Sequence, residues 1–473
     1  GDLDLYIVRG SPQQPPGAVL YQDVLCVNDG RGNYTIASQA LPAETACGQC
    51  VKAADFDGDG DLDLFVGGRV LPMNYPKTDR NFLLRNDSKG KDNPVFTDVT
   101  AQMFPELTYI GLISDALWTD FNNDTHPDLI LAGEWMPLTF FQNDGKTLTN
   151  VTKNSGIGDK TGWWTSLAGA DFDNDGDIDY IAGNFGENTY FKCSSEEPLR
   201  IYAKDFDGNG AYDPFISCYW QDSLGNRKEY FYHTRDDMIR QLTLIRRKFN
   251  TYGALGEATV QDVFSPKELE GAQIMKTNWM SSSYVENLGN GKFKISALPI
   301  EAQIAPLYGL LPYDFDRDGL VDILMVGNDY GMELMQGRAD AFYGMVLKNA
   351  GKGRFVPLKP TTSRFYVPYD ARALTRVSQA GGQDIILATQ NAGALLVFTP
   401  KLPAGKTIRL APGEVKARIT FRNGQQQVRE FYWGSTFLSQ ESRSLTFDAN
   451  IREITLMDQQ NKPTRKVDNP EYR

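Results

Sequence analysis

The stretch ADFDGDGDLDLFVGG (residues 54–68) places five aspartates within nine residues, directly before an apolar run. The same pattern returns four more times along the chain. The five copies are DFDGDGDLD (55–63), DFNNDTHPD (120–128), DFDNDGDID (171–179), DFDGNGAYD (205–213) and DFDRDGLVD (314–322). Position 6 is Gly in four copies and Thr125 in the second, and weaker copies keep only the final aspartate, Asp4 and Asp384. Repetition of this kind is the signature of a fold built from stacked units.

The residues around each copy predict strands. An apolar run precedes the motif, a second follows it, a third often ends in Asn before a Gly-containing turn, and a short fourth run comes next. These are hairpin signals. The seven final aspartates are separated on average by about 63 residues, the length of a four-stranded unit. Because such units bury both faces only by stacking, we expect an all-β, seven-bladed β-propeller over residues 1–400.

Two further regions are expected outside the repeats. The spacing of the final aspartates contains one short and one long interval, which indicates an insertion at about 221–272. Met238, Leu242 and Ile245 lie at helical spacing there, and SPKELEGA predicts a second short helix. Residues 401–473 are expected to form a small β-rich C-terminal segment.

The motif is suited to calcium, a hard cation that prefers six to eight oxygen ligands. Side chains at positions 1, 3, 5 and 9 of a tight loop, with a backbone carbonyl at 7, can surround one ion, and Gly at 6 permits the bend. We therefore expect up to five Ca²⁺ ions, of which the one at 120–128 has the weakest motif. The predicted ligands are Asp55, Asp57, Asp59, Asp63, Asp120, Asn122, Asp124, Asp128, Asp171, Asp173, Asp175, Asp179, Asp205, Asp207, Asn209, Asp213, Asp314, Asp316, Asp318 and Asp322.

Three other interpretations of the motif were compared with calcium binding. An EF-hand requires Glu at position 12, where these copies have Val66, Leu131, Ala182, Ile216 and Met325. An acidic turn without metal would hold several carboxylates close together without a counter-ion, which is costly. A catalytic carboxylate pair needs two groups in unlike environments, whereas this motif repeats one arrangement five times.

Composition narrows the classes of partner. The formal net charge of −12 argues against nucleic acid, and no apolar run is long enough for a membrane helix. The opening GDLDLYIVRG looks like the middle of a motif, so we expect further residues or domains before it. Cys47 and Cys50 form a CxxC without a second ligand pair, which favours a structural role, with a local disulfide as the alternative.

These residues resemble FG-GAP/VCBS repeats, the calcium-loop β-propeller blades also seen in integrin α-subunits. The phrases LILAGEWMPLTFFQNDG, GWWTSLAGADFDNDGDIDYIAGN and LYGLLPYDFDRDGLVDILMVGNDYG are similar to bacterial secreted propellers of the cartilage-acidic-protein type. REFYWGSTFLSQESRSLTF (429–447) resembles their ASPIC/UnbV-like C-terminal segment, although the ending DANIREITLMD departs from its usual pattern. The resemblance implies a scaffold for adhesion or ligand recognition, located outside the cell, in the periplasm or on the cell surface.

Two functions follow as hypotheses. The first is a non-enzymatic, calcium-stabilised binding or adhesion module for a glycan or a surface protein. The alternative is a polysaccharide-active enzyme, a lyase or hydrolase, on a propeller scaffold. His126 lies inside a metal loop, so His233 is the one place to look for catalytic chemistry, although a lone His is more often structural. A sugar platform is conceivable from Trp135, Trp163, Trp164, Tyr219, Trp220 and Tyr232, which are otherwise packing residues.

Overall fold

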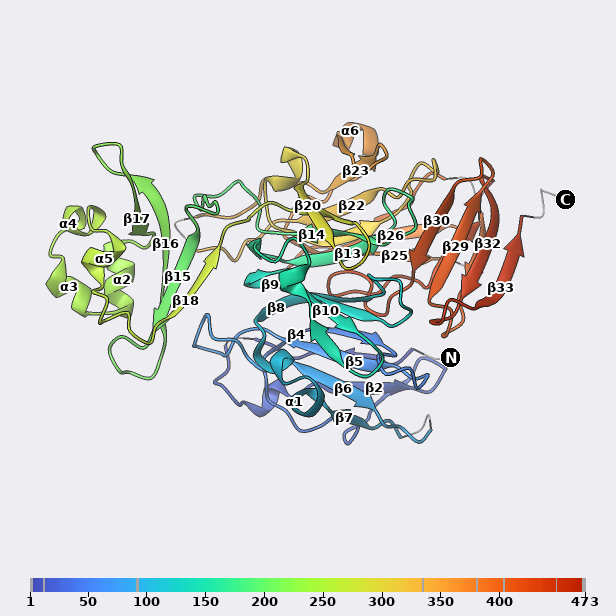
Figure 1. The fold of residues 1–473 in the computed structure, drawn as a ribbon, viewed down its shortest axis with the longest axis horizontal. Helices are drawn as coiled ribbons and strands as arrows, with labels where there is room; N and C mark the ends of the chain where they lie inside the picture. The colour runs from blue at the N-terminus through green and yellow to red at the C-terminus, as the bar shows by residue number, and fades with distance from the viewer. Residues whose placement is uncertain are drawn as a thin grey trace.

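The computed structural model describes residues 3–11, 13–90, 93–333, 336–379, 382–402, 405–447 and 449–469. Its sheets are antiparallel throughout, and the prediction of an all-β fold is confirmed. Figure 1 shows three regions in a row: a green unit with most of the helices, a central body of several sheets, and a red C-terminal sheet. Among the described residues, no helix is both long and apolar enough to cross a bilayer.

Six sheets form the central body, and the aspartate motif joins the first two strands of four of them. Their strands are β1 (Leu5–Ile7), β2 (Val24–Asn28) and β3 (Tyr34–Ile36); β4 (Gly48–Ala54), β5 (Asp63–Gly68), β6 (Phe82–Asn86) and β7 (Phe96–Asp98); β8 (Leu112–Thr119), β9 (Asp128–Pro137), β10 (Thr139–Asn143), β11 (Leu148–Asn150) and β12 (Thr161–Trp163); β13 (Ser166–Ala170), β14 (Asp179–Gly183), β19 (Ser283–Asn287) and β20 (Phe293–Ala297); β21 (Leu307–Pro312), β22 (Ile323–Gly327), β23 (Met345–Asn349) and β24 (Phe355–Leu358); and β25 (Ala371–Ser378), β26 (Asp384–Gln390) and β27 (Leu396–Phe398).

The first strands of consecutive sheets pack on one another in the order β4, β8, β13, β21 and β25. The helices of this region are single turns at the sheet edges, α1 (Thr100–Met103) and α6 (Pro360–Ser363). Apolar side chains between neighbouring sheets form the cores: Phe65, Leu83, Ile113 and Leu131 lie in one, and Ile181, Leu310, Met325 and Leu347 in another. This stacking is propeller-like. Seven blades in a closed ring are not what the described residues show.

The copy of the motif at 205–213 lies outside the stack, in a unit inserted between β14 and β19. This unit is a sheet of β15 (Leu199–Lys204), β16 (Asp213–Gln221), β17 (Arg227–Phe231) and β18 (Gln273–Thr277), covered by α2 (Arg235–Gln241), α3 (Leu244–Lys248), α4 (Tyr252–Gly256) and α5 (Val260–Val263). It is wider than the expected insertion at 221–272, because the strands carrying loop 205–213 belong to it. The insertion of this whole unit explains the one short and one long interval between the final aspartates.

The inserted unit has its own apolar core, in which Met238, Ile245 and Val263 pack against Phe215 of the sheet. The helical spacing near residue 240 therefore predicted helices at the right place. SPKELEGA forms turns instead of the second expected helix.

The C-terminal unit is β-rich. Its sheets are β28 (Lys406–Arg409) with β31 (Ser444–Phe447), and β30 (Gln426–Glu430), β29 (Lys416–Phe421), β32 (Ile451–Met457) and β33 (Pro463–Asp468). They enclose a separate core that includes Ile419, Ile454 and Leu456.

Residues 431–443 of the C-terminal unit, the axial segment, run among the first strands of the stacked sheets. Ala53 on β4 donates its backbone N–H to the Trp433 carbonyl at 3.2 Å. Thr436 Oγ1 donates to the Leu374 carbonyl of β25 at 3.0 Å. The Phe437 ring lies 5.3 Å from that of Tyr308 on β21. The axial segment thus supplies contacts that link sheets which do not pair with each other.

A buried ion pair lies beside this segment. Lys52 Nζ and Asp115 Oδ1 are 2.9 Å apart, and both side chains are almost fully buried. Lys52 also donates to the Gly434 carbonyl at 2.7 Å, and Asp115 Oδ2 accepts the Leu167 N–H at 3.0 Å. Hydrogen bonds to the remaining donors and acceptors are what make a buried pair tolerable. The pair therefore fixes β4, β8, β13 and the axial segment relative to one another.

Candidate metal centre

Each aspartate loop has the same backbone geometry. Position 6 has a positive φ in all five copies: Gly60 at 98°, Thr125 at 77°, Gly176 at 98°, Gly210 at 89° and Gly319 at 87°. Only residues without a Cβ adopt this conformation freely, which explains why glycine occupies four of the five positions. Thr125 adopts it with a β-branched side chain, and this strains the second loop.

Three oxygens converge in four of the loops. The carboxylate triplets, each with its ligand atoms within 4.8 Å of one another, are Asp55, Asp57 and Asp63; Asp171, Asp173 and Asp175; Asp205, Asp207 and Asp213; and Asp314, Asp316 and Asp322. These are residues predicted as ligands from the sequence. Whether they bind an ion remains a prediction, as does the role of Asp59, Asp179, Asn209 and Asp318 as further ligands.

The triplets suit a cation on electrostatic grounds. Oδ1 of Asp171 and Oδ1 of Asp314 are buried and have no hydrogen-bond partner among the described residues. Burial and the neighbouring carboxylates raise the pKa of each of these two side chains to about 7, against hydrogen bonds that lower it. An unpaired buried carboxylate oxygen is costly unless a positive charge meets it. The donor set, all oxygen, fits calcium.

The inserted loop differs from the loops at 171–179 and 314–322 in the pKa of its first aspartate. Backbone N–H groups of Gly208 and Gly210 donate to Asp205 at 2.7 and 2.8 Å. These bonds, led by that from Gly210, hold the pKa of Asp205 below its ordinary value, because burial there is slight.

The aspartate at position 9 has a structural task. Asp63 accepts the N–H of Phe56 at 3.2 Å and that of Asn86 at 2.8 Å, which ties its loop to the end of the third strand. Burial raises its pKa to about 8. The equivalent bonds from the third-strand Asn reach Asp128, Asp179 and Asp322 at 2.7–2.8 Å. Asp4 accepts the Asn28 N–H at 2.9 Å in the same manner, so this weak copy keeps the hydrogen bond between its final aspartate and the strand-end asparagine.

The asparagines at the ends of the third strands also link neighbouring sheets. Asn143 Nδ2 donates to the carbonyl of Phe56 in the preceding loop at 2.8 Å. Asn287 and Asn349 donate likewise to Phe121 and Phe172, at 2.9 and 2.6 Å. The sequence contained the signal, an Asn before each Gly-containing turn, but not the partner.

The second loop, 120–128, is arranged differently. Lys416 Nζ, from β29 of the C-terminal unit, lies 3.2 Å from Asp120 Oδ2 and 3.6 Å from Glu430 Oε1, and Lys416 is 8% exposed. Asn122 Nδ2 donates to Asp124 Oδ2 at 2.8 Å. Burial opposes the charge of Lys416, yet the charges of Glu430 and Asp120 outweigh it and raise the pKa of the lysine. A buried ammonium group therefore accompanies Asp120, in a loop that is not among the four carboxylate triplets.

The fifth loop also meets a lysine, but an exposed one. Lys348 contacts Asp316, and its Nζ lies 3.2 Å from Asp318 Oδ2, with the lysine side chain 36% exposed. Its half-open position differs from that of buried Lys416.

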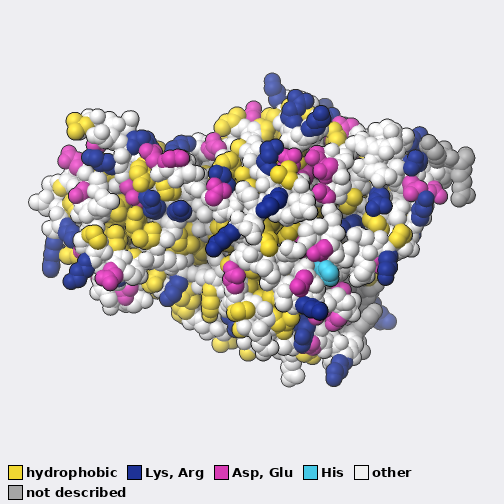
Figure 2. All heavy atoms as spheres, in the orientation of Figure 1, with side chains coloured by type: hydrophobic (Ala, Val, Ile, Leu, Met, Phe, Trp, Pro, Cys, Tyr) yellow, Lys and Arg dark blue, Asp and Glu magenta, His cyan; other side chains and the backbone are white. Residues whose placement is uncertain are grey.

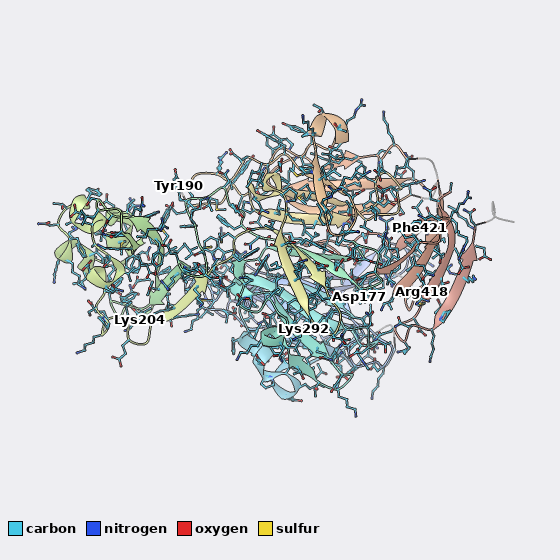
Figure 3. The ribbon with its side chains drawn as sticks, turned by 45° about the horizontal axis from the view of Figure 1, so that its top comes forward. Asp177, Tyr190, Lys204, Lys292, Arg418 and Phe421 are labelled. Atoms are coloured by element: carbon cyan, nitrogen blue, oxygen red, sulfur yellow. The ribbon has the colours of Figure 1, made fainter. Side chains whose placement is uncertain are left out.

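The C-terminal unit covers the loops of the stacked sheets. Gln459 Nε2 donates to the Asp55 carbonyl at 2.9 Å, Val428 N to Asp171 Oδ2 at 2.9 Å, and Gln427 Nε2 to the Gly319 carbonyl at 3.2 Å. Figure 3 shows Asp177 of the third loop on the same side as Arg418 and Phe421 of this unit, and Lys204 far from them in the inserted unit.

The remaining candidate residues lie in structural settings. His233 is largely buried and its Nε2 accepts the Ile216 N–H at 3.0 Å; burial lowers its pKa to about 4. His126 contacts Asp124 at 3.3 Å. Cys47 and Cys50 are buried free thiols, and burial raises the pKa of Cys50 to about 12.

The aromatic residues considered as a sugar platform mostly pack inside. Trp164 is fully buried and Trp135 nearly so. Trp135 and Trp163 pack edge-on at 4.9 Å, and Phe191 packs on both Trp163 and Tyr232.

Comparison with known proteins supports the repeat. A family model described as FG-GAP-like repeat matches residues 1–66 and 120–182, so the chain carries FG-GAP-like repeats there. The ASPIC/UnbV resemblance and the cartilage-acidic-protein type remain predictions. No curated protein matches the chain.

Solved structures are similar only remotely. An exotype rhamnogalacturonan lyase, YesX, aligns with 11% identity and a TM-score of 0.32, over 93% of this chain and 75% of the lyase. A structure of BBS1N in complex with ARL6DN aligns with 10% identity and a TM-score of 0.26, over 83% of this chain and 94% of that one.

Proposed function

We propose that this protein is a calcium-stabilised binding module that acts outside the cell, in the periplasm or on the cell surface. The observation that carries the proposal is the convergence of three carboxylates in each of four loops. Calcium bound there would supply positive charge to the carboxylates, including the buried and unpaired Oδ1 atoms of Asp171 and Asp314, and would hold the first two strands of each sheet together. In this proposal the ions stabilise the scaffold and the ligand is a glycan or a surface protein.

The second loop is assigned a different cation. Because the Lys416 ammonium lies against Asp120, we propose four calcium ions and one internal lysine in place of five ions. The charge requirement of the motif is the same in all five loops, and the source of the charge differs.

The enzymatic alternative has less support. A general base must be accessible and must titrate near the working pH. His233 is only partly exposed, its Nε2 accepts the Ile216 N–H, and burial lowers its pKa. The described part of the chain therefore favours a binding role for the module over a role for His233 in catalysis.

Calcium stoichiometry tests the proposal. Calorimetric titration of the chelator-treated protein is expected to give four ions per chain, one for each carboxylate triplet. Asp171→Asn should remove one ion, whereas Asp120→Asn should leave the number unchanged. A wild-type protein that binds no calcium, or an Asp120→Asn variant that loses an ion, would refute the assignment.

A further inference from the structure

A cleft of about 400 Å³ lies between the first two aspartate loops and the C-terminal unit. This volume falls within the range of small-ligand sites in proteins. Its lining comes from loop residues 58–62, from Trp118 and Thr119, and from residues 412, 413, 415, 416 and 430–433 of the C-terminal unit. The turn at 458–460 completes the rim. Figure 2 shows acidic and basic side chains interspersed over one face of the molecule. The lining of this cleft differs from that mixture, because its charged residues are mostly acidic.

Aromatic faces and carboxylates dominate the lining. Phe431, Tyr432 and Trp433 are consecutive in the axial segment, and Trp118 of β8 also lines the cleft. Around them lie six carboxylates, those of Asp55, Asp59, Asp61, Asp120, Glu430 and Asp458, with one basic side chain, Lys416. Lys416 is already committed to Asp120 and Glu430. The cleft is therefore acidic even with a calcium ion bound to the first loop, and it disfavours anionic ligands.

The carboxylates give the cleft many hydrogen-bond acceptors, and its backbone donors are largely engaged, whereas the Trp118 and Trp433 indole N–H groups and the Tyr432 hydroxyl have no partner among the described residues. The N–H groups of Gly58 and Gly60 donate to Asp55 at 2.8 and 3.1 Å, and Gln459 Nε2 donates to the Asp55 carbonyl. A sugar hydroxyl must both donate and accept, whereas an ammonium or guanidinium group only donates. Such cations are further attracted by aromatic faces. Two rings of the lining already carry such a contact on one face, Trp433 from the Arg443 guanidinium at 4.2 Å and Phe431 from that of Arg429 at 5.6 Å.

We propose that this cleft binds a basic side chain, a lysine ammonium or an arginine guanidinium, presented by a partner protein. The inference rests on the proposed binding function and names the chemistry of its partner. The cation would lie against the aromatic faces and donate to carboxylates of the rim, such as Asp458.

The test compares basic peptides with an uncharged peptide and with an amino sugar. Fluorescently labelled hexalysine and hexa-arginine are titrated with the calcium-loaded protein in about 150 mM salt, which screens diffuse attraction to the acidic surface. Fully acetylated hexalysine is the uncharged control, and a chitosan hexamer supplies amines on sugars. Binding of the basic peptides at least tenfold tighter than that of the other two is expected. Equal binding of acetylated hexalysine, or preference for chitosan, would overturn the proposal.

Two pairs of variants locate the binding. Gly413→Trp fills the mouth of the cleft from a position where an added side chain meets no atom within 4 Å, and Gly253→Trp makes the same change in the inserted unit, also in open space. Asp458→Asn removes a rim charge while keeping the oxygen that accepts the Lys462 N–H, and Glu257→Gln removes an exposed charge elsewhere. We expect Gly413→Trp to weaken hexalysine binding at least tenfold and Asp458→Asn severalfold, with both control variants within twofold of wild type.

Equal binding by Gly413→Trp and Gly253→Trp would place the peptide elsewhere and refute the proposal. The melting temperature of each variant with calcium and with chelator is measured in parallel. A protein indifferent to calcium would refute the calcium proposal whatever the peptides do. Calcium stabilisation without peptide binding would refute the cleft proposal alone.

Discussion

Loops 171–179 and 120–128 share one motif and one position in their sheets, yet they meet their charge requirement in different ways. In the first, three carboxylates converge and Asp171 Oδ1 has no partner among the described residues. In the second, the ammonium of Lys416 lies against Asp120. The comparison teaches that loops of the same geometry can differ in their source of positive charge, which in the second loop is a lysine almost 300 positions away.

Removal of calcium should give the largest effect and should act on the four triplet loops only. At free calcium of about 100 times the Kd, each site would contribute about 2.7 kcal/mol to the free energy of unfolding. Chelation is therefore expected to lower the melting temperature by on the order of 10 °C, measured by calorimetry. An Asp171→Asn variant should lose less on chelation than wild type, since one site is already lost. An unchanged melting temperature would contradict the comparison.

Lys416→Met should give the second largest effect, because it leaves Asp120 and Glu430 without their cation. Loss of one partner of a buried pair costs about 3–5 kcal/mol. Denaturant unfolding measures this loss, and added calcium is expected to restore part of it by entering the second loop. The matched control is Lys348→Met at the fifth loop, where an exposed pair is worth less than about 1 kcal/mol. Equal losses for both lysines would show that burial of Lys416 has no special role.

The asparagine links between sheets should come next. Asn143→Ala removes the bonds to the carbonyls of Phe56 and Pro127, at 2.8 and 3.0 Å, and leaves both oxygens without this partner. A loss of about 1–3 kcal/mol is expected in chemical denaturation. Asn86→Ala is the control, since its amide donates to Leu62 within the same sheet at 3.3 Å, a longer bond. A larger loss for Asn86→Ala would argue against the links between sheets.

Thr125→Gly should give the smallest effect, and a favourable one. Thr125 has a φ of 77°, and the strain of a β-branched residue there exceeds the entropic cost of glycine, so a gain of about 1 kcal/mol is expected. Thr149→Gly on exposed strand β11 has no such strain to release and should destabilise the protein. Chemical denaturation is expected to give a higher midpoint of unfolding for Thr125→Gly than for Thr149→Gly, and the reverse order would contradict the prediction.

Local patterns predicted what local physics determines. The positive φ of Gly60 and Gly176 follows from the tight loop. The hydrogen bond between Asp63 and the third strand follows from the order of strand, turn and strand. The helices near residue 240 were predicted from their apolar spacing. Each of these features depends on residues close together in the chain.

Features that depend on distant residues were missed. The residues near Lys416 give no indication that its partner lies in loop 120–128. The motif DFDGNGAYD likewise does not distinguish an inserted sheet from a sheet of the stack. Counting repeats therefore gave seven units for a stack of six sheets. The motif specifies a hairpin and its charge requirement, whereas the order of the sheets is set by packing between segments far apart in sequence.

The axial segment also has a consequence for how the protein is made. Domains usually fold as units during synthesis, beginning with the N-terminal ones. Here Ala53 on β4 and Leu374 on β25 bond to Trp433 and Thr436. A ribosome must therefore add 382 residues after Lys52 before its partner Gly434 of the axial segment is made. Until then the early sheets lack the contacts that the axial segment makes with them, so the oldest part of the chain waits longest for its final partners.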